Sequence, residues 1–283
     1  MIPPFRTRAL IAAVAVALTL VPLVPLVGQA QDRTAYLLPV PEAAEALGLH
    51  FGRATPGMTA SSPLAFGPQL GDLYVGGNYQ LPTRYSDSDD VSLTAGFGLG
   101  NSIDAVGLEV AMTATSTFSA GVADRLSVAV KASRITVYGI AVAAGMEGFA
   151  VTGGASSEAR RSLYGVVSKV FDLTFSSIPA GYLSSVTVNL GAGDGRFCRE
   201  AVAGGVPAGE DDCNANMFAS VGVRATEWLG IVADWTGQDL ALAASIAPLK
   251  KLPIVIAPGL ADITGSGGDG VRFTLGFGMS IKY

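Results

Sequence analysis

Charged residues are scarce in this chain. Only 14% of its 283 residues are Asp, Glu, Lys or Arg, while 49% are hydrophobic. Soluble proteins average about 25% charged residues. The net charge of -5 comes without a basic cluster, which argues against nucleic acid as a partner. Such a composition fits a chain that buries a large core or one that faces lipid.

Histidine is almost absent. His50 is the single histidine, it precedes the predicted main fold, and the chain has no G-x-S-x-G motif. A Ser-His hydrolase needs its histidine beside the nucleophile, so these absences exclude that class of enzyme. We therefore expect no catalysis, no cofactor and no metal site.

Cysteine is also rare, with two in the whole chain. Cys198 and Cys213 bracket the stretch "FCREAVAGGVPAGEDDC". In an exported protein such a pair is expected to form a disulfide. The predicted bond would clip a surface loop.

A long apolar run occurs only at the beginning of the chain. Residues 1–30 combine two arginines, an apolar stretch and the small residues Gly28 and Ala30, as in a secretory signal peptide cut after Ala30. An uncleaved anchor helix is the alternative, but Pro22 and Pro25 interrupt the run. No later stretch reaches the roughly 20 apolar residues of a spanning helix. An exported chain of this kind is either a soluble β protein or a membrane barrel.

Residues 31–69 differ in composition from the remainder of the chain. "PVPEAAEALGLH" predicts a short helix, and "GRATPGMTASSPLAFGPQ" is rich in Gly, Pro, Ser and Thr, as linkers are. We expect this region to be a periplasmic linker or a plug, outside the main fold at 70–283.

From residue 71 onward the side chains alternate with a period of two. In "VSLTAGFGLG" the apolar residues Val91, Leu93 and Phe97 share one face, and Gly, Ser and Thr occupy the other. A soluble sandwich coats its second face with charges, whereas small, mildly polar residues suit the inside of a closed barrel. Glycine within a strand marks tight curvature or close approach of another backbone.

These segments predict an antiparallel transmembrane β-barrel of about twelve strands. Long and short connections alternate along the chain, as expected if the first strand begins and the last strand ends on the periplasmic side. One strand is weakened by Pro253 and Pro258, which lack a ladder donor. The less regular predicted strands are 138–148, 162–171, 239–247 and 252–261.

The final run, "GVRFTLGFGMSIKY", has apolar residues at every second position and ends on an aromatic residue. It resembles the assembly signature of Gram-negative-type outer-membrane β-barrel proteins, with Tyr in place of the usual Phe. The resemblance implies recognition by the barrel-assembly machinery, insertion in the outer membrane and contact with membrane lipid. It implies no particular activity. The signature positions are Phe273, Leu275, Phe277, Met279, Ile281 and Tyr283.

If the apolar rows face lipid, the polar residues between them line the lumen. They either pair with one another to fill a closed barrel or line a pore with a mild anion preference. We therefore predict a non-catalytic small pore, open to small solutes, or a structural outer-membrane protein. A surface adhesin using the 198–213 loop and a soluble secreted β protein are the alternatives. The predicted lumen-lining residues are Glu109, Lys131, Lys169, Asn189, Arg224, Asp234, Arg272 and Lys282.

Overall fold

The fold is seen in a computed structural model. It describes residues 56–83, 89–115, 125–136, 138–153, 161–173, 182–198, 202–203, 206–207, 215–249, 253–267 and 270–282. The predicted signal peptide at 1–30, the predicted short helix and His50 lie outside these residues. Among the described residues, no helix is long and apolar enough to cross a membrane.

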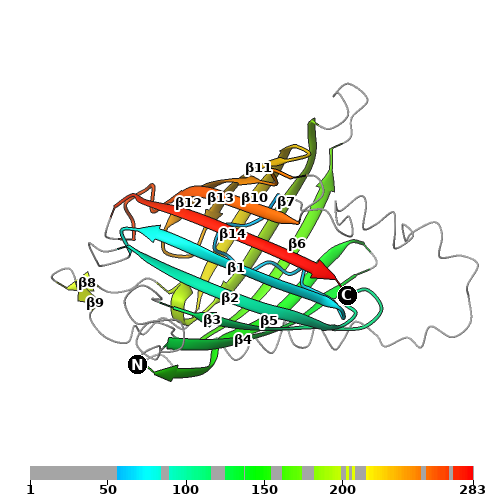
Figure 1. Cartoon of the computed structure of the whole chain (residues 1–283), viewed down its shortest axis with the longest axis horizontal. Coiled ribbons are helices and arrows are strands. Elements are labelled where there is room, and N and C mark those ends of the chain that lie inside the picture. The colour runs from blue at the N-terminus through cyan, green and yellow to red at the C-terminus, as the bar shows by residue number, and fades with distance from the viewer. Residues whose placement is uncertain are drawn as a thin grey trace, which may run out of the picture.

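Twelve strands close into one antiparallel barrel in the order β1-β14-β13-β12-β11-β10-β7-β6-β5-β4-β3-β2 (Figure 1). A separate two-residue pair, β8 with β9, lies within the connection from β7 to β10. The strands are β1 (Asp72–Leu81), β2 (Asp90–Gly100), β3 (Gly107–Ala114), β4 (Arg125–Ile135), β5 (Ile140–Gly153), β6 (Ser162–Asp172), β7 (Tyr182–Gly193), β8 (Val202–Ala203), β9 (Val206–Pro207), β10 (Asn216–Thr226), β11 (Leu229–Trp235), β12 (Leu240–Ile246), β13 (Ile254–Ala261) and β14 (Arg272–Lys282).

The predicted closed barrel of about twelve strands is confirmed, including all four of its less regular strands. Closure joins the first strand to the last, from Asp72 opposite Lys282 to Leu81 opposite Phe273. The weakest predicted strand is β13, whose pairing with β12 is interrupted between Ile256 and Gly259. Pro258 lies in that interruption, as expected of a residue without a backbone N–H.

The two ends of the barrel differ in their connections. We call the end where β1 begins and β14 finishes the terminal end, and the opposite one the loop end. The longest connection, 194–215, is at the loop end and contains β8, β9 and a 3-10 turn, η2 (Gly195–Phe197). Connections at the terminal end include the two-residue turn at 227–228.

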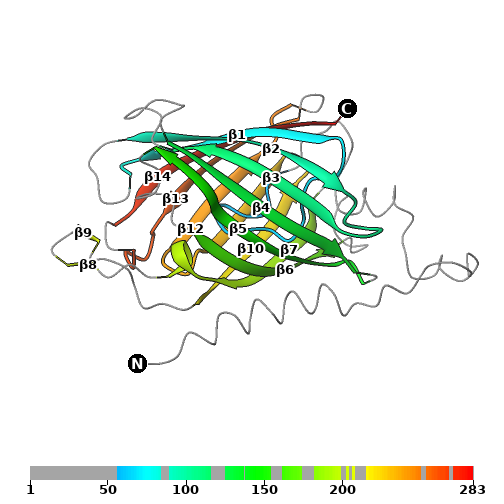
Figure 2. The same ribbon diagram turned by 90° about the horizontal axis from the view of Figure 1, so that it is seen from below.

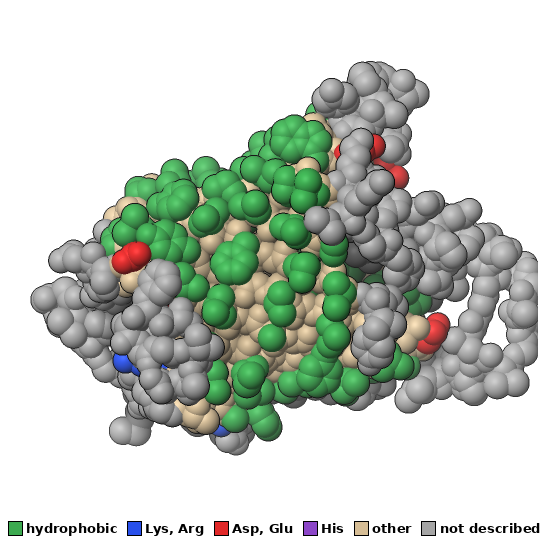
Figure 3. All heavy atoms as spheres, viewed as in Figure 1, with side chains coloured by type: hydrophobic (Ala, Val, Ile, Leu, Met, Phe, Trp, Pro, Cys, Tyr) green, Lys and Arg blue, Asp and Glu red, His purple; other side chains and the backbone are tan. Residues whose placement is uncertain are grey.

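The alternation read from the sequence matches the two faces of the barrel wall. Outward side chains are apolar and exposed, with Val75 at 50%, Leu108 at 47% and Ile231 at 53% of their full exposure. Figure 3 shows hydrophobic side chains spread over the strands on the face it displays. Inward positions are small or polar, such as Ser127 and Ser133 on β4, both buried. The large apolar side chains of this wall therefore mostly face away from the barrel interior.

Candidate functional site: the barrel lumen

Residues 56–69 lie inside the barrel (Figure 2). Two glycines of the wall show how closely this lumenal segment approaches the strands. A Cβ on Gly98 would come within 2.4 Å of the Gln69 carbonyl oxygen, and one on Gly222 within 2.9 Å of the Met58 oxygen. These inner-face glycines thus admit another backbone, as their presence in strands suggested.

The lumenal segment makes a U-turn. The segment begins near the terminal end, where the Gly57 N–H donates to Ser245 Oγ on β12 at 2.5 Å. It then runs toward the loop end, where it bonds to Asp234 on β11. It returns to the terminal end beside Gly98 and Gly100 of β2. The segment therefore enters and leaves the lumen at the same end of the barrel.

Asp234 holds the turn of this segment. The backbone N–H groups of residues 60–62 all donate to its Oδ2, at 2.8 to 2.9 Å, and the Ser62 hydroxyl donates to Oδ1. Asp234 is fully buried. A buried carboxylate is tolerated when such charge-assisted hydrogen bonds surround it.

A second anchor lies on β6 and β7. The Ala65 N–H donates to Ser168 Oγ at 2.9 Å. The amide of Asn189 donates to the Pro63 carbonyl oxygen at 2.7 Å, and the Ser168 hydroxyl donates to the Asn189 side-chain oxygen. The wall side chains bond to backbone groups of the segment. They therefore hold the path of its backbone and do not depend on which side chains it carries.

Lys131 provides a third anchor from β4. Its ammonium donates to the carbonyl oxygens of Leu64 at 3.2 Å and Phe66 at 3.0 Å, and pairs with Glu109 at 2.5 Å. The Tyr74 hydroxyl donates to the other oxygen of Glu109. The ion pair is thus tied to both the wall and the segment.

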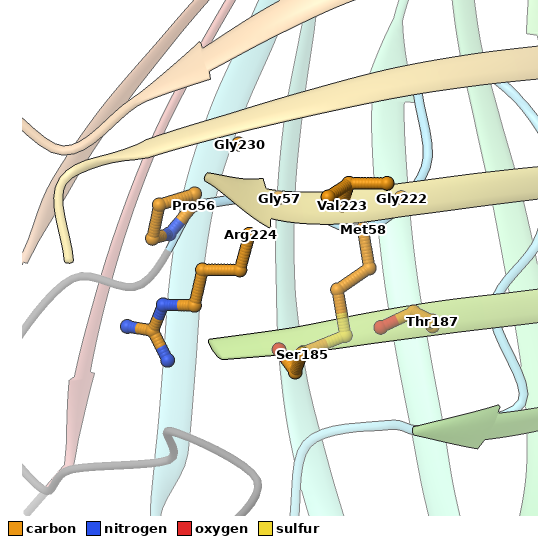
Figure 4. Close-up of a pocket in the computed structure, with 9 residues that line it drawn as sticks. All are labelled: Pro56, Gly57, Met58, Ser185, Thr187, Gly222, Val223, Arg224 and Gly230. Atoms are coloured by element: carbon orange, nitrogen blue, oxygen red, sulfur yellow. The ribbon is translucent and has the colours of Figure 1, made fainter. Parts of the chain in front are cut away.

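A small pocket marks where the segment enters. It is lined by Pro56, Gly57 and Met58 together with wall residues of β7, β10 and β11. In Figure 4 the Met58 side chain reaches toward Ser185, and the Arg224 guanidinium points away from Met58. Arg224 therefore lies at the entrance of the segment.

At the loop end, a different part of the chain covers the lumen beside β5, β6 and β10. In the 194–198 stretch, Phe197 is fully buried and stacks on Phe218 with ring centroids 4.5 Å apart. Tyr164 meets both rings edge-on. Ala65 of the lumenal segment belongs to the same apolar cluster. The lumen is therefore apolar near β5, β6 and β10, which the sequence did not predict.

Arg196 links the two closing elements. Its guanidinium pairs with Glu147 on β5 through two hydrogen bonds and donates to the Ser61 carbonyl oxygen at 3.2 Å. Burial lowers the pKa of Arg196, but the Glu147 carboxylate, together with Tyr164 and Asp234, raises the pKa above its ordinary value. The charged guanidinium thus connects the 194–198 stretch to the turn of the lumenal segment.

The predicted lumen-lining residues fall into three groups. Six have inward side chains, as shown by their partners, their burial or the parity of their strands. Lys282 ends β14, but its side chain is outside the described set. Lys169 lies on the outer face. The six inward residues are Glu109, Lys131, Asn189, Arg224, Asp234 and Arg272.

The prediction for Lys169 is wrong. Its neighbour Ser168 points inward to Asn189, and successive strand residues point to opposite faces. The Lys169 ammonium instead lies 5.2 Å from the ring centroid of outward Phe171. The inner row of β6 carries apolar Tyr164 and Val166, so polarity no longer distinguishes its faces. Near a strand end, a long lysine can extend its ammonium toward water.

The remaining predicted sites are only partly described. Phe273, Phe277, Met279 and Ile281 are exposed on the outer face of β14, and Leu275 shares their parity. Tyr283 lies outside the described residues. Cys198 is buried after η2, but Cys213 is not described, so the disulfide and the 198–213 adhesin loop stay predictions.

Several lumenal partners were missed from the sequence. Asp239 pairs with Arg272 at 2.9 Å, and both are buried. Glu147 and Arg196 meet across 49 residues. No spacing signals such contacts, because the barrel brings the strands together. In the described part of the chain, no group of three or more His, Cys, Asp and Glu could hold a metal.

Comparison with known proteins adds little. No protein-family model matches this chain, and no curated protein matches it. Among solved structures, the Acinetobacter baumannii outer membrane protein Omp33 aligns with a TM-score of 0.40 and 10% identity, over 75% of this chain and 98% of that one. Similarity at this level carries no conclusion about function.

Proposed function

We propose that this chain is an outer-membrane β-barrel that acts as a small pore restricted by its own lumenal segment. Its outer surface supports the membrane location. Exposed large apolar side chains occur on every barrel strand except β4. Soluble monomers rarely expose apolar patches above a few hundred Å², whereas closed barrels satisfy their backbone in lipid.

The observation that carries the pore proposal is the hydrogen-bonded segment 56–69. Barrels of about 8 strands are filled by their own side chains, and those of about 16 hold an aqueous channel. The twelve strands here lie between these sizes. Small wall residues leave a space that a separate segment occupies. Because this segment enters and leaves at one end, it can withdraw without breaking the wall.

A structural, non-conducting barrel is the competing function. The ion pairs Glu109–Lys131 and Arg272–Asp239 and the aromatic cluster around Phe197 favour a filled, rigid interior. This function predicts that the barrel stays closed when its lumenal segment is removed, because side chains would still block the lumen.

Conductance in planar bilayers distinguishes the two functions. We compare the full chain with a variant that lacks residues 31–69. The pore proposal expects larger current steps from the shortened variant, because the hydrogen-bonded segment no longer occupies the lumen. Each sample is first checked for folding by its shift in gel mobility between unheated and boiled states.

Asp234→Asn serves as a second variant, should the deletion prevent folding. It weakens the acceptor for three backbone N–H groups without shortening the chain, and is expected to raise the frequency of openings. A folded deletion variant and a folded Asp234→Asn barrel that both conduct nothing would overturn the pore proposal.

A further inference from the structure

The lumen is packed on one side. Nine inward side chains of β6, β7, β10 and β11 are each at most 3% exposed, because the lumenal segment and the Phe197 cluster cover them. This packed wall consists of Ser162, Val166, Ser168, Thr187, Asn189, Phe218, Ser220, Val232 and Asp234.

The opposite side of the lumen is different. Arg272, at the loop end of β14, is buried against Asp239. Beyond it, the inward side chains of β14 and β1 retain exposure. Ser280 and Asn78 are exposed, and the rest are intermediate. We call these residues the accessible wall: Tyr74, Gly76, Asn78, Gln80, Thr274, Gly276, Gly278 and Ser280.

Wall glycines give an independent measure of the space. A Cβ on Gly278 would have one atom within 4 Å, the Val75 oxygen at 3.8 Å. One on Gly276 would meet only Ala257, at 3.4 Å and beyond. Both neighbours belong to adjacent wall strands. At Gly98 and Gly222, by contrast, the lumenal segment occupies the space that a Cβ would need.

The accessible wall offers neutral hydrogen-bonding groups. Asn78 and Gln80 carry amides, and Thr274 and Ser280 carry hydroxyls. Two charges of the lumen are engaged by partners, Lys131 by Glu109 and Arg272 by Asp239. Pore selectivity follows the groups that line the path. A lining of amides and hydroxyls suits an uncharged solute that both donates and accepts hydrogen bonds.

We infer that a path runs along β14 and β1, between this wall and the lumenal segment, and that it admits small, neutral, polar solutes. The inference rests on the proposed pore function and identifies its solute class. It requires no withdrawal of the segment. Gln69 bonds to Asp72 at the terminal end of β1, and the other bonds of the segment to the barrel strands go to β2, β4, β6, β7, β11 and β12.

Thiol labelling tests the position of the path without relying on transport. Thr274→Cys and Gly278→Cys place a thiol on the accessible wall, and Ser220→Cys places one on the packed wall. A small water-soluble thiosulfonate is applied to barrels in lipid vesicles, with the unsubstituted chain as background. We expect the first two thiols to react many-fold faster than the third. Equal rates at all three positions would overturn the inference.

Solute flux tests the class of solute. Gly278→Leu projects into the path where a Cβ meets no close atom, so it should slow glycerol-driven swelling of vesicles several-fold. Ala219→Leu, on the outer face of β10 between inward Phe218 and Ser220, should leave the rate unchanged. A charged solute of similar size is expected to enter more slowly than glycerol.

The outcomes separate this inference from the pore proposal. If the variant lacking 31–69 conducts but Gly278→Leu does not slow glycerol entry by the full chain, the pore stands and the path is wrong. If neither chain passes current or glycerol, the pore itself is wrong. Faster entry of the charged solute would overturn the assigned solute class.

Discussion

Several charged residues inside the barrel meet specific partners. Asp234 receives three backbone N–H groups, and Lys131 donates to two carbonyl oxygens as well as to Glu109. Removing one member of a buried ionic arrangement leaves an uncompensated charge, which costs far more than the pair contributes. The lumenal segment is therefore sensitive to single substitutions of wall residues.

Asp234→Asn is expected to lower the free energy of unfolding by about 2 kcal/mol, since hydrogen bonds to a charged group contribute about 1.5 to 3 kcal/mol. The amide also presents a donor where three N–H groups converge. Urea unfolding of the barrel in detergent measures the loss. Faster chymotrypsin cleavage at Phe66 in the folded variant would show that the segment has loosened.

Ser220→Ala is the matched control for this prediction. Ser220 lies directly opposite Asp234 in the register of β10 and β11 and is also buried. Its hydroxyl makes no hydrogen bond among the described residues. The Ser220→Ala variant should have the same free energy of unfolding and the same rate of chymotrypsin cleavage as the unsubstituted chain. An Asp234→Asn variant that behaves like Ser220→Ala would contradict the role given to Asp234.

At the scale of elements, two segments without regular secondary structure complete the interior. The lumenal segment fills the lumen from the terminal end, and the 194–198 stretch covers it at the loop end. Arg196 connects them through the Ser61 carbonyl oxygen. The Gly/Pro composition predicted the first as linker or plug, but nothing in "DGRFC" signals that Phe197 enters the barrel.

Phe197→Ala is expected to destabilise the barrel by about 3 to 5 kcal/mol, as large-to-small changes at buried aromatics do. The substitution leaves a cavity beside Phe218 and Tyr164, and it removes ring contacts at 4.5 and 6.0 Å. Chemical unfolding in lipid vesicles measures the loss.

Phe277→Ala provides the comparison on the opposite face. Phe277 is 44% exposed on the outer surface of β14. In the proposed membrane location, lipid chains would fill the space that a shorter side chain leaves. Its cost should be clearly smaller than that of Phe197→Ala. Equal costs for the two variants would show that Phe197 is not part of a packed interior.

At the scale of the whole molecule, the chain places apolar residues outside and polar residues inside. This arrangement arises because successive side chains of each strand point to opposite faces of the wall. Few charges therefore lie on the outer face of the strands, in keeping with the low charged fraction of the sequence. The outer face at the middle of the strands is the region where a charge should be least tolerated.

Val188→Arg tests this prediction. Val188 is 39% exposed near the middle of β7, and an arginine at the centre of a bilayer costs about 2 to 4 kcal/mol. Unfolding from lipid vesicles should show this loss, while Val188→Ala should lose much less. A Val188→Arg chain as stable as Val188→Ala, and soluble without detergent, would contradict the membrane location.

The sequence by itself determined the barrel, because strand alternation depends only on local order along the chain. It also predicted the inward positions of residues such as Glu109, Asn189 and Arg272. It failed at Lys169, where the inner row of β6 is apolar and the two faces have similar polarity. Only the tertiary structure decided that residues 56–69 turn back inside the barrel, that Phe197 packs into the lumen at the loop end, and that Arg272 pairs with Asp239. These contacts join segments far apart in the chain, and closure of the barrel is what brings them within reach.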